Sequence, residues 1–157
     1  MRHARSMPSL RTLLPALMIA LAPALAGARP AATPAQAALA SVQGFFDAMA
    51  RHDQAAMRSW ILPDGGMALM RKGKPVQLSL GDFVGRIKPD GHHIAEVIHD
   101  PLVKVDDDVA MVWAPYRFML DGKLHHCGTD AFSLVRMDGR WLIAAVADTS
   151  RETCTAG

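Results

Sequence analysis

Two Asp-Gly pairs, each lying between long β-rich segments, limit the fold of this 157-residue chain more than any other feature of its sequence. Asp-Gly between such segments is a strong signal for a two-residue hairpin turn, because both turn positions need positive φ angles. The pairs Asp121-Gly122 and Asp138-Gly139 therefore predict an antiparallel meander of three strands, at 109–120, 123–137 and 140–149.

Helical signals precede this meander. Thr33 is followed by Pro34 and Gln36, a capping-box pattern with proline in the first turn, which predicts a helix from 34 to about 51. Apolar residues recur along this helix at helical spacing: Ala38, Val42, Phe45, Phe46 and Met49. Asp53 and Ser79 are placed to cap two shorter helices. Helices followed by a run of strands predict an α+β domain.

Short strands and turns are expected between these helices and the meander. The second helix should end before Pro63, and Asp64-Gly65-Gly66 should form a turn. Residues 67–71 and 76–78 are short strand candidates. The segment 94–105 is β-rich, and Pro101 within it indicates an edge position or a bulge.

The first 26 residues have the three parts of a secretion signal. A basic leader precedes an apolar run at 12–22, and Ala24-Leu25-Ala26 fits the rule for cleavage before Gly27. A second site would cut before Arg29, and an uncleaved N-terminal anchor is the alternative. Because the apolar run is shorter than the roughly 20 residues of a spanning helix, we expect a periplasmic or secreted protein with no membrane segment once processed.

The charge balance argues against a nucleic-acid partner. The chain has 17 basic and 15 acidic residues, a net charge of +2. Three of the arginines lie in residues 1–26, so the remainder carries a net charge of −1. About 130 residues suffice for one domain with a core. The expected organisation is a signal peptide at 1–26, a flexible lead-in at 27–33, a domain at 34–152 and a tail at 153–157.

The order of helices, hairpin and long strands resembles the NTF2-like (SnoaL-like) superfamily, and is closest to its bacterial branch described as putative lumazine-binding. The resemblance covers essentially the whole mature chain and is carried by Phe45-Phe46-Asp47-Ala48-Met49, Ile98-His99-Asp100-Pro101, Ala114-Pro115-Tyr116-Arg117-Phe118, Asp121-Gly122, Cys127-Gly128, Phe132, Asp138-Gly139-Arg140-Trp141 and Asp148-Thr149. It implies an NTF2-like cone, in which N-terminal helices pack on a strongly bent, mainly antiparallel sheet around an apolar pocket, often in a homodimer. The superfamily includes isomerases, dehydratases, cyclases and non-catalytic binding proteins, so the fold leaves the function open.

Two-residue turns at both Asp-Gly pairs predict a strand register. With residue 120 paired to 123 and 137 to 140, Trp113 lies opposite Asp130 and Arg117 lies opposite His126. Because side chains alternate along a strand, these four residues share one face of the sheet. We expect this face to be concave, with Trp113 and Phe46 as the aromatic floor of a pocket.

Two alternatives to this pocket stay open. The polar residues of the face could form a solvated sheet edge or a dimer contact, or the opposite face could line the pocket with Tyr116, His125 and Asp148. The expected ligand is a small apolar or anionic organic molecule. The candidate ligand-binding residues are Phe46, Trp113, Tyr116, Arg117, His126 and Asp130.

No pattern in the sequence requires catalysis. Asp130 and Asp148 are the candidates for a general acid or base, because a carboxyl group near an apolar surface has its pKa moved towards neutrality. The neighbouring histidines His92-His93 and His125-His126 point to opposite faces of a strand, so neither pair can chelate one ion. We therefore expect no metal and no cofactor.

Cys127 and Cys154 are the two cysteines of the chain, and an oxidising compartment would allow them to pair. The expected register places Cys127 opposite Ser150, which is about 13 Å from Cys154 along a straight strand. A disulfide needs Cα atoms within about 7 Å. The bridge therefore requires the chain to double back after Ser150.

Three functions fit these expectations. The first is an exported domain that binds a small molecule in an apolar pocket. The second is an enzyme of the isomerase, dehydratase or cyclase type that uses a pocket aspartate as general acid or base. The third is a dimeric interaction protein without a ligand.

Overall fold

The computed structural model describes residues 31–154. The signal peptide expected at 1–26, the first part of the lead-in and the end of the tail lie outside the described residues. The elements follow one another as α1 (Pro34–Ala50), α2 (Gln54–Arg58), β1 (Ile61–Arg71), β2 (Lys74–Ser79), α3 (Leu80–Arg86), β3 (Ile94–Ile98), β4 (Leu102–Asp106), β5 (Val109–Leu120), β6 (Lys123–Met137) and β7 (Arg140–Arg151).

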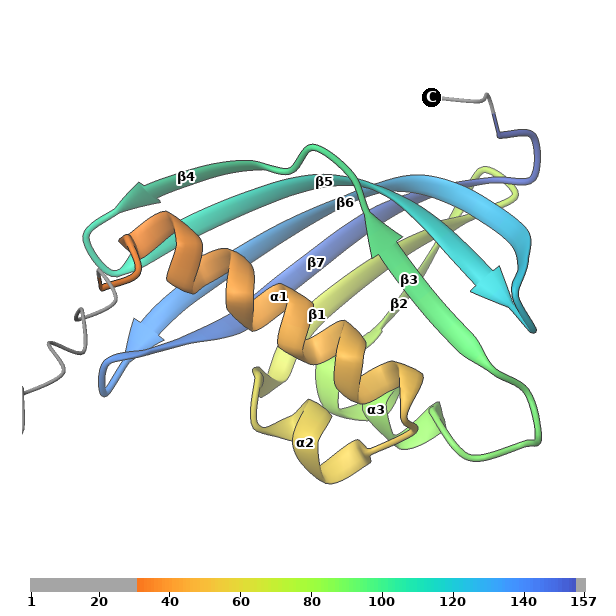
Figure 1. The fold of residues 1–157 in the computed structure, drawn as a ribbon, viewed down its shortest axis with the longest axis horizontal. Helices are drawn as coiled ribbons and strands as arrows, with labels where there is room; N and C mark the ends of the chain where they lie inside the picture. Colours follow the sequence, from red (N-terminus) through yellow and green to blue (C-terminus); the bar gives the residue numbers. More distant parts are fainter. Residues whose placement is uncertain (1–30, 155–157) are drawn as a thin grey trace, which may run out of the picture. The chain divides into compact units, whose positions relative to one another are not determined.

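All the strands belong to one curved sheet with the order β2-β1-β7-β6-β5-β3, and β4 also pairs with β5. The β1–β7 pair is parallel and the other pairs are antiparallel. Figure 1 shows α1 lying along the concave side of this sheet, with α2 and α3 near the end of α1. The expected α+β fold, with helices packed on a bent and mainly antiparallel sheet, is confirmed.

The helix caps expected from the sequence are present. Thr33 and Gln36 form the reciprocal capping box of α1, with N···O distances of 2.8 and 3.2 Å. The Asp53 side chain accepts from the backbone of α2, and Ser79 accepts from the backbone of α3. These bonds satisfy amide groups that a helix leaves open at its first turn.

The core lies between α1 and the concave face. Val42 and Phe45 are almost fully buried on α1, and they belong to one cluster with Phe132, Leu134 and Ile143 of the sheet. Phe132 meets Phe46 edge to face, with ring centroids 5.7 Å apart. The apolar face predicted for the first helix is therefore the face that covers the sheet.

One expected turn is wrong. Asp64-Gly65-Gly66 is part of β1, which bulges there against β7, and α2 ends at Arg58, before the predicted stop. A side chain at Gly65 would collide with the carbonyl group of Ala144, so glycine is needed for the close approach of these strands rather than for a turn. The segment expected at 94–105 is divided into β3 and β4 by a break that contains Pro101.

Both hairpin turns are as expected, but the register beyond them is not. Asp121-Gly122 and Asp138-Gly139 all have positive φ angles, and Leu120 pairs with Lys123 as Met137 does with Arg140. Each hairpin then contains a bulge, since the pairing passes over His125 in β6 and over Ala144 in β7. Trp113 consequently lies opposite Ala131 rather than Asp130, and Arg117 lies opposite Cys127 rather than His126.

The bulges change which side chains share a face. A one-residue shift moves every side chain of a strand to the other face relative to its neighbour. The concave face therefore carries some side chains that were expected on it and some that were expected on the opposite face. Its members include Ala114, Tyr116, Phe118, His126, Asp130, Phe132, Val146 and Asp148.

Candidate functional site

A cavity of about 230 Å³ lies between α1, α3 and the concave face of the sheet. Most of its wall is apolar, with aromatic rings from both layers and methionines from α1 and β1. Its apolar lining residues are Phe45, Phe46, Met49, Met67, Leu69, Phe83, Ile87, Ile94, Phe118, Phe132 and Val146. The polar and charged side chains that reach it are Arg71, Glu96, Tyr116, His126, Asp130 and Asp148.

Glu96 and Asp130 form a pair of carboxyl groups at this cavity. Asp130 is 4% exposed, and its Oδ2 has no hydrogen-bond partner among the described residues. Burial raises the pKa of Asp130 to about 7. Burial also raises the pKa of Glu96 well above its ordinary value, and the neighbouring Asp130 raises it further by charge and by hydrogen bonding. At neutral pH the pair therefore retains at least one proton, and the two carboxyl groups titrate together.

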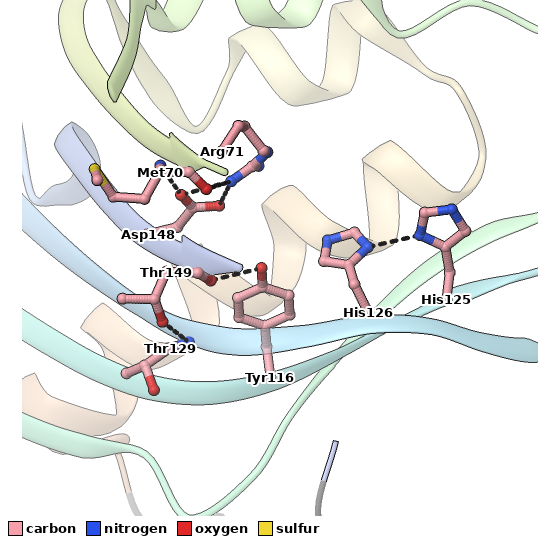
Figure 2. A network of polar contacts seen from close by, with 8 residues as sticks. All are labelled: Met70, Arg71, Tyr116, His125, His126, Thr129, Asp148 and Thr149. Carbon is pink, nitrogen blue, oxygen red and sulfur yellow. Dashed lines mark hydrogen bonds and ion pairs between the residues drawn. The ribbon is translucent and has the colours of Figure 1, made fainter. Parts of the chain in front are cut away.

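Asp148 is held by a different set of partners. It is 7% exposed and accepts from the backbone N–H of Met70 at 2.8 Å. The Nη1 of Arg71 contacts both of its carboxylate oxygens, at 2.8 and 2.7 Å, and also donates to the carbonyl group of Met70. Figure 2 shows this cluster where β1 runs beside β7. Because Asp148 is fully engaged, it acts as an anchor for Arg71 rather than as an available base.

Tyr116 fixes the shape of the cavity beside these acids. Its hydroxyl group donates to the carbonyl oxygen of Thr149 at 2.9 Å (Figure 2). Its ring packs over Gly128, where an added Cβ would lie 2.7 Å from the Tyr116 Cε1. Burial and the surrounding carboxylates raise the pKa of Tyr116, so the hydroxyl group stays protonated. The proton of Tyr116 is committed to the sheet and is not free for a ligand.

His126 closes another part of the wall. Its ring stacks on Phe118 with centroids 4.7 Å apart, and its Nδ1 lies 2.9 Å from the Nδ1 of His125. Burial lowers the pKa of His126, and the nearby His125 and Arg71 lower it further. Since one Nδ1 must donate and the other accept, the two histidines carry at most one positive charge.

Of the candidate residues, the structure brings Phe46, Tyr116, His126 and Asp130 to the cavity, together with Asp148. Their ligand-binding or catalytic roles stay predictions. These residues had been divided between two opposite faces in the expected register, and the bulges unite them.

The concave position expected for Trp113 and Arg117 is wrong. Trp113 is 49% exposed on the other face of the sheet, and Arg117 lies there beside His99 and Cys127. The register error of one residue is the cause, because it reverses the faces of β5 relative to β6. Neither side chain lines the cavity.

Two charged residues of the site were not found from the sequence. Glu96 was overlooked although it alternates with Ile94 and Ile98 in a β-rich segment, which places an acid on an apolar face. Arg71 gave no local signal, because its partner Asp148 is 77 residues away.

Cys127 and Cys154 form a disulfide with a Cα–Cα distance of 5.9 Å. Cys127 pairs with Arg151 in the sheet, not with Ser150 as the expected register had it, because Ala144 bulges. The chain leaves the strand after Arg151 and turns, which brings Cys154 back beside Cys127. The bridge thus fixes the segment 151–154 against the end of β6.

Within residues 31–154, no three histidine, cysteine, aspartate or glutamate side chains are grouped so that they could hold a metal ion. None of the helices in that range has the length and apolar character needed to cross a lipid bilayer.

Comparison with known proteins supports the same architecture. No curated protein matches the chain. A putative dehydratase of the NTF2-like family from Streptomyces avermitilis is 18% identical, with 76% of this chain and 96% of that chain covered and a TM-score of 0.62. An NTF2-like protein from Cytophaga hutchinsonii is 14% identical, with coverages of 72% and 94% and a TM-score of 0.62.

A third solved structure gives a similar superposition. It is a putative calcium/calmodulin dependent protein kinase II association domain from Xanthomonas campestris, 22% identical, with coverages of 79% and 95% and a TM-score of 0.61. At these identities the likeness shows the fold alone. The family model described as "Putative lumazine-binding" matches residues 33–147, which is most of the chain. The chain therefore belongs to the putative lumazine-binding family and has the NTF2-like fold.

Proposed function

We propose that this protein binds a compact organic molecule in the cavity between α1 and the sheet. The observation that carries the proposal is an apolar cavity of about 230 Å³ with the Glu96–Asp130 carboxyl pair in its wall. Ligand sites typically combine apolar walls with a few convergent polar groups. Since a cavity of about 150 Å³ holds benzene, this one has room for roughly nine non-hydrogen atoms.

The carboxyl pair indicates which hydrogen-bonding groups the ligand carries. A protonated carboxyl group is a strong donor, and the buried Oδ2 of Asp130 has no partner among the described residues. A ligand with a carbonyl or ring nitrogen could accept from the pair, and one with an N–H group could donate to Oδ2. A flat ring with such groups would also fit the aromatic walls formed by Phe46, Phe118 and Phe132.

Native mass spectrometry of the mature protein tests this proposal. The expected result is a bound small molecule that is lost on denaturation and also lost from Asp130→Asn. Asp47→Asn, on the exposed side of α1, is the matched control and should retain it. Because the family description names lumazine, that compound belongs in a panel of added ring compounds. The proposal fails if neither a co-purified nor an added compound occupies the cavity.

A second function, proton-transfer catalysis, is favoured by the state of Asp130. A general base works best when its pKa is near the operating pH, and burial raises the pKa of Asp130 to about 7. Glu96, whose raised pKa keeps it protonated, would donate a proton to another atom of the substrate as Asp130 removes one. In an enzyme, Asp130→Asn would stop the conversion of substrate supplied in excess, even where binding is only weakened, and mass spectrometry of the substrate after incubation measures this. Unchanged conversion by this variant would exclude Asp130 as the base.

Export and dimer formation remain proposals taken from the sequence. For export, intact mass of protein from the cell envelope should begin at Gly27 or Arg29, whereas a full-length cytoplasmic species as the sole stable form would overturn it. Sedimentation of the processed protein measures whether it is a homodimer. A dimer with a solidly filled cavity and no ligand would favour the interaction-only function.

A further inference from the structure

A second hollow, on the protein surface, lies beside the cavity. Arg71 and His126 line both the cavity and a depression of the surface beside it. The depression is bounded by the β1–β2 turn, by β6, and by the segment after β7 that the disulfide holds. It therefore adjoins the cavity at a basic residue and a histidine.

Positive groups exceed negative ones in this depression. Its charged lining residues are Arg71, Lys72, Arg151 and Glu152, and His125 and His126 add at most one further positive charge. Neither Lys72 nor Arg151 makes an ion pair among the described residues. An anion placed here would meet two lysine or arginine side chains whose charges are not matched by a partner.

Arg71 has further N–H donors for a group bound in this depression. Its bonds within residues 31–154 all use Nη1, which contacts Asp148 and the carbonyl group of Met70. A guanidinium group also carries N–H donors on Nε and Nη2. Asp148 holds the group in place, since its carboxylate takes the Nη1 contacts, and the Arg71 side chain is 40% exposed. The arrangement is that of an oriented donor beside a cavity.

We propose that the ligand is an amphipathic organic anion, whose ring occupies the apolar cavity and whose carboxylate or phosphate lies in the basic depression formed by Arg71, Lys72 and Arg151. This inference rests on the proposed small-molecule binding and specifies its ligand class. The positions of the charges orient the ligand, because the Glu96–Asp130 carboxyl pair faces the ring and basic side chains face the anion. Placing the anion among the carboxyl groups would instead bring like charges together.

Two compounds of nearly the same shape, one anionic and one neutral, test the inference. Phenylacetate and phenylacetamide both have a ring that is small enough for the cavity. They are titrated calorimetrically at pH 6, where Asp130 is mostly protonated because its pKa is about 7. We expect phenylacetate to bind at least about tenfold more tightly, as for a charge-assisted hydrogen bond. Raising the salt concentration should reduce this preference, because the depression is open to solvent.

Variants separate the depression from the cavity. Lys72→Met and Arg151→Met should each weaken phenylacetate about three- to tenfold and leave phenylacetamide unchanged. Lys74→Met is the matched control, since Lys74 is an exposed lysine of the same hairpin that does not line the depression. Equal binding of the two compounds by the wild-type protein would overturn the anion assignment and leave the cavity proposal intact. Binding of neither compound would also overturn the anion assignment, and the cavity proposal would fall with it if native mass spectrometry finds no other occupant.

Discussion

Asp130→Asn should stabilise the protein at alkaline pH. Asp130 is 4% exposed, and its buried carboxyl group has a pKa of about 7 in the folded chain against an ordinary value of 3.8. Because the folded state binds this proton more tightly than the unfolded state, the ionised carboxylate opposes folding. The penalty is absent below about pH 4, grows between pH 4 and pH 7, and is complete above pH 7.

The size of the effect follows from the two pKa values. Their difference corresponds to about 4 kcal/mol of unfolding free energy, of which roughly 2 to 3 kcal/mol arises between pH 5 and pH 8. Asparagine has nearly the shape of the protonated acid but cannot ionise, so the variant should escape this penalty. Glu96 shares the titration, and its pKa should fall in the variant because Asp130 raises it in the wild type.

The measurement is urea unfolding of wild type and variant at a series of pH values, with the disulfide intact. The variant should gain in unfolding free energy relative to wild type as the pH rises from 5 to 8, while Asp47→Asn should show a constant difference. A gain that does not depend on pH would refute the titration of Asp130 in this range. A loss of stability at pH 8 would show that its carboxylate is satisfied in the folded state.

Three further changes test the packing around the site. Phe132→Ala removes a ring that is 2% exposed and should cost about 3–5 kcal/mol in urea unfolding. Gly128→Ala drives a methyl group into the backbone carbonyl oxygen of Thr149 and against the Tyr116 ring, so it should cost at least about 3 kcal/mol and shift the tyrosine signals in NMR; unaltered stability would contradict the close approach. Reduction of Cys127–Cys154, which are 27 residues apart, should lower stability by about 3.5 kcal/mol, and an unchanged midpoint after thiol treatment would argue against the bridge.

Local signals in the sequence were enough for most of the fold. The Thr33 capping box, the Asp53 and Ser79 caps and the two Asp-Gly turns all lie where expected, because each depends on contacts within four residues. Together with the order of elements, they led to the α+β class and to the NTF2-like resemblance. The parallel pairing of β1 with β7 had no such signal, since these strands are distant in the chain.

The candidate site was only partly predictable for a related reason. Phe46 could be placed because helical periodicity is local. Asp130 was singled out as a carboxyl group beside Trp113, but Trp113 pairs with Ala131 and lies on the other face. Glu96 and Arg71 gain their importance from partners on other strands, Asp130 and Asp148. An ion pair or a coupled pair of carboxyl groups depends on distance in space, which residue spacing does not report.

The sequence by itself determined where the helices begin, where the two Asp-Gly hairpins turn and that the segments after residue 94 are strands. Tertiary structure alone decided which face of each strand is concave, because the bulges at His125 and Ala144 displace the register of two hairpins by one residue each. A bulge bends its strand and increases the local twist, so its position depends on how the long sheet curves around α1. Trp113 is therefore on the outer face and Tyr116 in the cavity, since a shift of one residue reverses the faces of a strand.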